Sequence, residues 1–150
     1  MMRTRKAIGA IVTQENRFLI VRKVAINTKA GKEYQSGSWD FVKGGVEVED
    51  ETLVASMRRE LLEETGSVAY TLKKQFHDTI SFTFPEKIQT KIGYHYQVTT
   101  MFHFEYIGDG HDLQPNDKEI DQITFVSEQS LLHLLEHEES KAFFIRNKPY

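Results

Sequence analysis

The chain shows two β-type hydrophobic stretches near its start, then a polar stretch and a short apolar one. Lys6 to Thr13 and Arg17 to Val24 are rich in Ile, Val and Ala and are separated by a polar Gln-Glu-Asn turn. This pattern predicts a β-hairpin. The glycines and lysines of Ala25 to Ser38 predict a long loop, and Trp39 to Val42 predicts a short buried strand.

A helix is predicted over Asp50 to Thr65. The segment opens with acidic residues, contains good helix formers and stops at Gly66. Val54, Met57 and Leu61 recur at spacings of three and four, which places them on one face. We therefore expect this helix to pack against a sheet through an apolar stripe.

The second half of the chain is mostly extended, with a helical end. The expected elements are strands over Val68 to Phe84 (broken at Pro85), Ile92 to Ile107 and Ile123 to Val126, a loop over Gly108 to Asp117, and helices from Ser127 through His137 and over Glu139 to Arg146. Strands, one strong helix, more strands and a closing helix predict an α+β fold with a mixed β-sheet between helices. With 150 residues and 39% hydrophobic content, residues 1–150 are expected to form a single domain.

The composition of the chain restricts its expected cellular location and its expected binding partners. The chain has no cysteine, which excludes disulfides and thiolate metal sites and favours a cytoplasmic location. The basic start, Met1 to Lys6, is followed by too short an apolar run for a signal peptide, and no stretch is long enough to span a membrane. The net charge of -3 argues against a general nucleic-acid binder. A homodimer is plausible only by base rate.

Three carboxylates share one face of the predicted helix. Glu60, Glu63 and Glu64 lie three and four residues apart and would repel one another unless a cation sat among them. Oxygen ligands without cysteine point to Mg²⁺, Mn²⁺ or Ca²⁺. Judged on these residues alone, a solvated helix face paired with Arg58 and Arg59 is the favoured interpretation.

The wider pattern changes that judgement. Residues 45–67 resemble the Nudix box, G-x5-E-x7-R-E-U-x-E-E-x-G-U, in which U is aliphatic. Gly45 is followed after five residues by Glu51, and after seven more by the run Arg-Glu-Leu-Leu-Glu-Glu-Thr-Gly over 59–66. There are two departures. Ser67 stands at the last aliphatic position, which should weaken packing there, and the loop before Glu51 lacks the usual Pro-Gly.

The resemblance implies a Nudix α/β/α sandwich and an activity. Nudix hydrolases cleave a pyrophosphate bond in a nucleoside diphosphate linked to another group, with Mg²⁺ or in some cases Mn²⁺. By this resemblance Glu60 and Glu64 would be the main metal ligands, and Glu63 would complete the site or position the attacking water. Glu51 and Arg59 would form an ion pair that braces the helix and the loop.

The resemblance extends to weaker candidates. The carbonyl of Gly45 could reach the metal, and Glu119 could be a further acidic ligand, although an exposed acidic loop is equally consistent. The stretch 39–45 is similar to the W-x-x-P-K-G approach of dinucleoside-polyphosphate and RNA-pyrophosphate hydrolases. Lys43 and Arg22 could contact phosphates, with solvent-facing side chains as the alternative. Tyr96, like its aromatic neighbours, could stack a base, but such a row is more often core.

Three functional classes remain to be weighed. A nucleotide pyrophosphohydrolase is favoured because Glu51, Glu60, Glu63 and Glu64 are all present. A catalytically silent Nudix-fold sensing module, binding a nucleotide without cleaving it, is the alternative. An isomerase of isoprenoid diphosphates on the same fold would require a catalytic cysteine, and the chain has none. The small-molecule nucleotide substrate would be chosen by segments outside the box.

Overall fold

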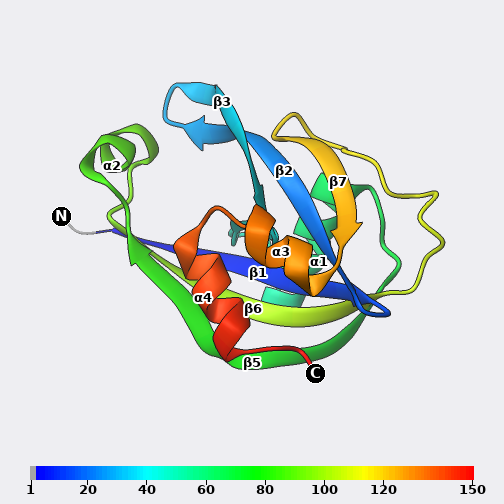
Figure 1. The fold of residues 1–150 in the computed structure, drawn as a ribbon. Helices are drawn as coiled ribbons and strands as arrows, with labels where there is room; N and C mark the ends of the chain where they lie inside the picture. Colours follow the sequence, from blue (N-terminus) through cyan, green and yellow to red (C-terminus); the bar gives the residue numbers. More distant parts are fainter. Residues whose placement is uncertain (1–2) are drawn as a thin grey trace.

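The computed structural model describes residues 3–150, which form a seven-stranded sheet and four helices (Figure 1). The elements in chain order are β1 Thr4–Gln14, β2 Arg17–Thr28, β3 Gly31–Asp40, β4 Val42–Gly45, α1 Leu53–Thr65, β5 Tyr70–Thr83, α2 Glu86–Ile92, β6 Tyr96–Tyr106, β7 Ile120–Val126, α3 Glu128–Leu134 and α4 Glu138–Arg146. Helices α3 and α4 lie on one side of the sheet and α1 on the other, which confirms the predicted α+β sandwich (Figure 1).

The sheet is mixed, as expected. Its strand order is β3-β2-β1-β6-β5, with β4 paired to β1 and β7 paired to β2. Strands β1 and β6 run parallel, in register from Thr4 opposite Tyr96 to Thr13 opposite Glu105, and the other pairs are antiparallel. Because β2 leaves β1 after the hairpin turn and continues with β3, the sheet opens at one end, next to β4.

Two hydrophobic layers cover the two faces of the sheet. On one side, Met57 and Leu61 of α1 pack against a cluster that includes Phe102 and Phe104. On the other side, Phe143 and Phe144 of α4 belong to a second cluster. All six are fully buried, and alternate residues along the central strands serve alternate layers, as the pleat of a strand requires. The sheet therefore holds α1 firmly on one face.

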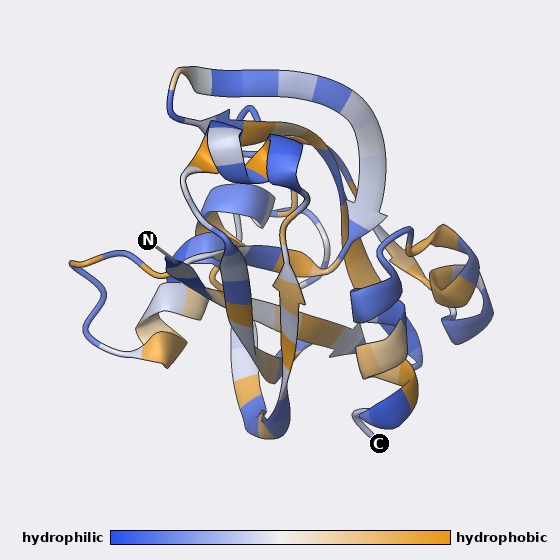
Figure 2. Ribbon diagram, turned by 90° about the vertical axis from the view of Figure 1, so that its left-hand side faces the viewer, coloured by the Kyte–Doolittle hydropathy of each residue, from blue (hydrophilic) through white to orange (hydrophobic). Residues whose placement is uncertain are grey.

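The predicted first hairpin is confirmed, but the long loop over Ala25 to Ser38 is wrong. That segment completes β2 and forms β3, with the reversal at residues 29–30 and Gly31 at φ 113°. Half of the β3 residues are exposed, on both faces of the strand, and the strand is largely hydrophilic in Figure 2. A strand that projects beyond the core buries neither face, so it carries no alternating pattern for sequence reasoning to find.

Helix α1 has well-defined caps. Thr52 is its N-cap, and the Thr52 Oγ1 accepts a hydrogen bond of 3.0 Å from the Ala55 N–H. Gly66 adopts φ 78° and closes the helix, as predicted. The helix begins three residues later than predicted, because Asp50 and Glu51 belong to the loop before the cap. This placement matters for the ion pairs described below.

Helix α2 was not predicted. It occupies residues between the break at Pro85 and Gly93, where only a break and the start of an extended run were expected. It has seven residues and buries none of them, so it offers too little periodicity to be recognised. The remaining elements lie within a few residues of their predicted positions. In the part of the chain from residue 3 onward, no helix has the length and apolar character to cross a membrane.

Candidate active site

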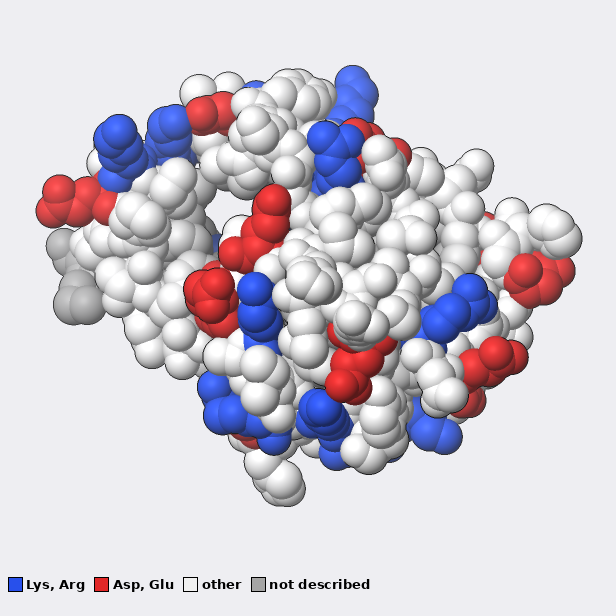
Figure 3. Space-filling view, viewed as in Figure 1, with Lys and Arg blue, Asp and Glu red and all other residues white. Residues whose placement is uncertain are grey.

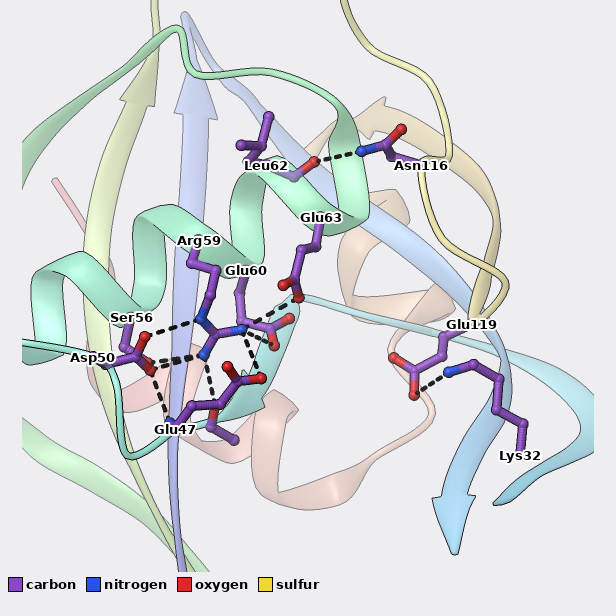
Figure 4. Close-up of polar contacts among 11 residues, drawn as sticks. Lys32, Glu47, Asp50, Ser56, Arg59, Glu60, Leu62, Glu63, Asn116 and Glu119 are labelled. Carbon is purple, nitrogen blue, oxygen red and sulfur yellow. Dashed lines mark hydrogen bonds and ion pairs between the residues drawn. The ribbon is translucent and has the colours of Figure 1, made fainter.

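The guanidinium of Arg59 connects α1 to the loop that precedes it (Figure 4). Its Nη1 donates to Glu60 Oε1 and Glu63 Oε2, both at 3.2 Å, and its Nη2 donates to the Gly45 carbonyl at 3.0 Å. One side chain thus joins two of the predicted carboxylates to the loop that precedes the helix. The Gly45 carbonyl, a predicted metal contact, is engaged with Arg59 in this arrangement.

The brace between the helix and the loop uses Asp50 rather than Glu51. Arg59 Nε donates to Asp50 Oδ1 at 3.0 Å and Arg59 Nη2 to Asp50 Oδ2 at 2.9 Å, a bidentate pair. These bonds hold the pKa of Asp50 well below its usual value. Glu51 is exposed, and among residues 3–150 it makes no ion pair. The predicted Glu51–Arg59 pair is wrong, because the N-cap at Thr52 turns Glu51 outward.

Glu60 reaches the open end of the sheet over Gly44. A Cβ atom added at Gly44 would lie 2.1 Å from Glu60 Cδ, so only glycine leaves room for this carboxyl group. Burial, and next the charge of Glu63, raise the pKa of Glu60 to about 7. Gly44 is a site residue that sequence reasoning left unassigned, although the Gly-Gly pair was a signal for close backbone approach.

Glu64 is the most deeply buried carboxylate of the site. Its side chain is 1% exposed, and among the described residues its Oε2 is the buried side-chain polar atom without a hydrogen-bond partner. Burial raises the pKa of Glu64 well above its usual value; Lys23 opposes the shift, while Glu60, Asp117 and Glu119 add to it. A buried oxygen without a partner is costly unless a ligand satisfies it.

A second acidic group faces α1 from the loop before β7. Glu119 lies across from the helix carboxylates in Figure 4, where its Oε1 is 3.4 Å from Lys32 Nζ. The charge of Glu119 adds to the raised pKa of Glu64. Within residues 3–150, no three acidic or histidine side chains already stand in ligand geometry. A cation would therefore draw these carboxylates away from Arg59 and Lys32.

Two of these carboxylates border a cavity of about 540 Å³, whereas Glu63 and Glu64 are not among its lining residues. Glu60 and Glu119 line it together with the cationic side chains of Arg5, Lys23 and Lys29. Figure 3 shows a hollow beside α2 with acidic side chains at its edge. A cavity of this size fits a small-molecule ligand, and the mixture of charges suits a polyanion bound together with a cation.

Arg5 is a partly buried cation that lines this cavity, and sequence reasoning missed it. Its Nη2 lies 2.8 Å from where a Cβ of Gly45 would stand, and its Nη1 donates to Gln97 Oε1 at 2.7 Å. Burial lowers the pKa of Arg5, and the charges of Glu60 and Glu119 oppose the shift. Among the described residues it has no carboxylate ion pair. Its position in the basic N-terminal run gave no hint of burial.

Lys43 lines the cavity, but its ammonium group is already engaged. Lys43 Nζ lies 3.0 Å from Asp40 Oδ2 and also donates to Ser140 Oγ, which in turn donates to Asp40 Oδ1 at 2.8 Å. Lys43 balances the buried charge of Asp40. The ammonium group of Lys43 therefore has protein partners beside the cavity and is not free to bind a phosphate in this arrangement.

The structure does not bring two predicted substrate residues into the cavity. Arg22 Nη1 pairs with Asp121 Oδ2 at 2.9 Å, and it is the next residue, Lys23, that lines the cavity. Tyr96 is not among the lining residues, whereas Tyr94 is. Neighbouring strand residues point to opposite faces, so the step from Lys23 to Arg22 on β2 is enough to move a side chain out of the cavity. Phe102 is fully buried in the core.

Ser67, the departure from the box, has acquired polar partners. Its hydroxyl donates to Asp112 Oδ2 and accepts from the Ala69 N–H at 3.0 Å. Asp112 also accepts from the Tyr106 hydroxyl. The expected loss of packing is replaced by hydrogen bonds that fix the loop over residues 108–117 to the end of α1, and Ser67 is only 1% exposed.

Comparisons with known proteins agree with this arrangement. A model of the NUDIX domain matches residues 3–147. An RNA pyrophosphohydrolase from Bartonella bacilliformis is 31% identical over 119 residues, which are 77% of this chain and 69% of that protein. The match therefore includes the box and both of its flanks.

Solved structures show the same fold at lower identity. The MutT protein from Methanosarcina mazei Go1 is 21% identical with a TM-score of 0.70, covering 97% of this chain and 93% of that one. The NUDIX domain of NrtR from Shewanella oneidensis, solved with ADP ribose, is 13% identical with a TM-score of 0.71, covering 97% and 87%.

Proposed function

The chain belongs to the Nudix family and is a hydrolase of phosphoric anhydrides, and from this premise we propose its reaction. We propose that it cleaves, with Mg²⁺, a pyrophosphate bond in a nucleoside diphosphate linked to another group, such as a nucleotide or a dinucleoside polyphosphate. Mn²⁺ would be a possible substitute. The proposed partner is a small-molecule nucleotide rather than nucleic acid in general.

The observation that carries this proposal is the buried oxygen of Glu64. Glu64 Oε2 has no hydrogen-bond partner in residues 3–150, yet it lies on the same helix face as Glu60 and near the charges of Asp117 and Glu119. A buried polar atom without a partner is costly, and a ligand that contacts it would remove that cost. A hard divalent cation is the ligand that carboxylate oxygens suit best.

The residues present fit such a cation. Glu60 and Glu64 would hold it, and Glu63 or Glu119 would complete its oxygen ligands. When bound, Mg²⁺ would neutralise the charge of the diphosphate and lower the pKa of a coordinated water. Arg59 would stay bound to Asp50 and the Gly45 carbonyl while Glu60 and Glu63 turn from it toward the cation.

The cations of the cavity would bind the substrate phosphates. Arg5 is held by Gln97, so its guanidinium is oriented before a ligand arrives. Lys23 and Lys29 line the same cavity and add positive charge. Phosphoryl-type transfer depends mainly on positioning and charge stabilisation, which are what these side chains provide.

The test is turnover of a nucleotide panel with Mg²⁺. The panel contains nucleoside triphosphates, ADP-ribose, sugar nucleotides, dinucleoside polyphosphates and 5′-triphosphorylated RNA. Metal-dependent turnover of one class, detected as released phosphate with a coupled phosphatase or pyrophosphatase where needed, lost in Glu64→Gln and retained in Glu51→Gln, would support the proposal. Nucleotide binding without turnover on any class would instead support a sensing module.

A second candidate substrate is the 5′ end of RNA. It is favoured by the 31% identity to an RNA pyrophosphohydrolase, an observation that none of the low-identity structural neighbours provides for other substrates. The RNA arm of the panel separates the two candidates. If only the triphosphorylated RNA is turned over, the enzyme reads an RNA end rather than a free nucleotide.

A further inference from the structure

The cavity next to Glu60 has a second, chemically different wall. Five side chains from the end of β5, from α2 and from the residue following Gly93 form it, and we call them the α2 subsite: Phe82, Phe84, Ile88, Ile92 and Tyr94. Figure 2, which views the molecule from the α2 side, shows hydrophobic residues interleaved with hydrophilic ones there. One cavity therefore joins charged residues to an apolar wall.

Four of the five residues of this wall lie outside the core, whereas Phe82 packs against the second core cluster. Phe84, Ile88, Ile92 and Tyr94 belong to neither of the two core clusters found in residues 3–150, and each remains partly exposed. Helix α2 itself buries no residue. Ile88 and Ile92 are four residues apart on one helix face, and both line the cavity. Apolar side chains left facing a cavity gain stability only when a ligand covers them.

The wall is fixed although most of it is outside the core. Phe82 and Phe84 pack edge to face, with ring centroids 5.0 Å apart. Gln89 Nε2 donates to the Phe84 carbonyl at 2.7 Å, and Gly93 closes the helix at φ 85°. The wall is thus a prepared surface, because both ends of the helix that carries it are fixed by local hydrogen bonds.

We propose that the α2 subsite binds the nucleobase of the substrate while its phosphates extend along Arg5 toward Glu60; this rests on the proposed function. A nucleotide joins a flat, largely apolar ring to a polyanion, and the cavity offers both complements. A sugar or inositol phosphate would place hydroxyl groups against Phe84, Ile88 and Ile92, where they lose hydrogen bonds to water without replacement. The subsite therefore selects substrates that carry a base.

The direct test compares two ligands by calorimetry. A nonhydrolysable nucleoside triphosphate analogue contains the base, whereas inorganic tripolyphosphate contains only the anion. Ile88→Ser combined with Ile92→Ser should weaken the nucleoside analogue roughly tenfold or more, the effect of removing two apolar contacts. Its affinity for tripolyphosphate should stay within about twofold. Lys87→Ser, on the same helix but exposed and outside the cavity, is the matched control.

A milder variant guards against a folding effect. Tyr94→Leu keeps apolar volume and removes the ring, so it should weaken the nucleoside analogue by a smaller factor and leave tripolyphosphate unchanged. Equal affinity of the wild type for both ligands, or an equal loss for both ligands in the variants, would overturn the proposal. A loss confined to the nucleoside analogue would support it.

Turnover separates this proposal from the proposed function. Tight, base-dependent binding without hydrolysis would keep the α2 subsite and reject the hydrolase reaction. Hydrolysis with no difference between the wild type and the double variant would do the reverse. Loss of kcat/KM for a free nucleoside triphosphate or for 5′-triphosphorylated RNA would support the base contact and identify which source supplies the base.

Discussion

Helices α1 and α2 line the same cavity, but they are held in very different ways. Helix α1 buries Met57 and Leu61 completely and is tied to its loop by the bidentate Asp50–Arg59 pair. Helix α2 buries no residue and is fixed by hydrogen bonds near its two ends. The carboxylates are therefore on a helix whose replacement would disturb the core. The α2 subsite, in contrast, can vary in sequence at little cost to the stability of the fold.

The largest effect is expected from a substitution of Glu64 on α1. Glu64→Gln replaces the buried carboxylate with a neutral amide of nearly the same shape, so kcat/KM should fall by roughly a thousandfold as several kcal/mol of charge stabilisation are lost. The metal-free variant should melt at the same or a higher temperature, because the amide has no charged form that burial would disfavour. Steady-state kinetics and thermal denaturation in EDTA check both results. Full activity in this variant would show that Glu64 is not a ligand.

Gly44 tests whether the position of the Glu60 carboxylate is essential. In Gly44→Ala the added Cβ would stand 2.1 Å from Glu60 Cδ, and the carboxylate must move. A displacement of this size should lower kcat/KM by about a hundredfold. Overpacking should also cost roughly 1–3 kcal/mol in the free energy of unfolding. Urea denaturation and kinetics measure the two effects, and unchanged kinetics would mean that Glu60 works from another position.

Asp50 and Glu51 form a matched pair of neighbouring acids. Asp50→Asn removes the charge that Arg59 binds with two hydrogen bonds, and kcat/KM should fall by roughly tenfold to a hundredfold, as when a residue that supports a ligand is lost. Glu51→Gln changes an exposed side chain and should leave both activity and melting temperature close to the wild type. The reverse result would show that the ion pair follows the sequence pattern rather than this structure.

The sequence predicted the α1 end of the cavity much better than the α2 end. The helix, its stop at Gly66 and the converging face of Glu60 and Glu64 follow from spacing alone, because a buried amphipathic helix has a strict period. Helix α2 and strand β3 lie outside the core, so burial imposes no period on them.

The errors at single positions have a related cause. Asp50 was overlooked because the box pattern fixes residue types at sequence positions, whereas the N-cap decides which of two adjacent acids faces Arg59. Lys23 lines the cavity in place of Arg22 for the same geometric reason. A shift of one position along an extended segment turns the side chain to the opposite side.

The smallest effect is expected where α4 is tied to β5, away from both ends of the cavity. Asp78 accepts hydrogen bonds from Asn147 at 2.9 Å and from Arg146 at 2.9 and 3.1 Å, and these bonds lower the pKa of Asp78 below its usual value. Because the folded-state pKa is the lower one, the stabilisation is complete above the unfolded value of about 3.8 and is lost as the pH falls through the folded value.

Asp78→Asn should therefore lower the free energy of unfolding modestly at pH 7, and the gap to the wild type should close as the pH falls below about 3.8. Urea denaturation of both proteins at pH 7 and pH 3 measures this gap. Activity at pH 7 should be unchanged, because Asp78 does not line the cavity. A gap as large at pH 3 as at pH 7 would mean that the side-chain shape, and not the charge, holds α4. Loss of activity would instead couple α4, which carries Glu139 at the cavity wall, to the reacting end.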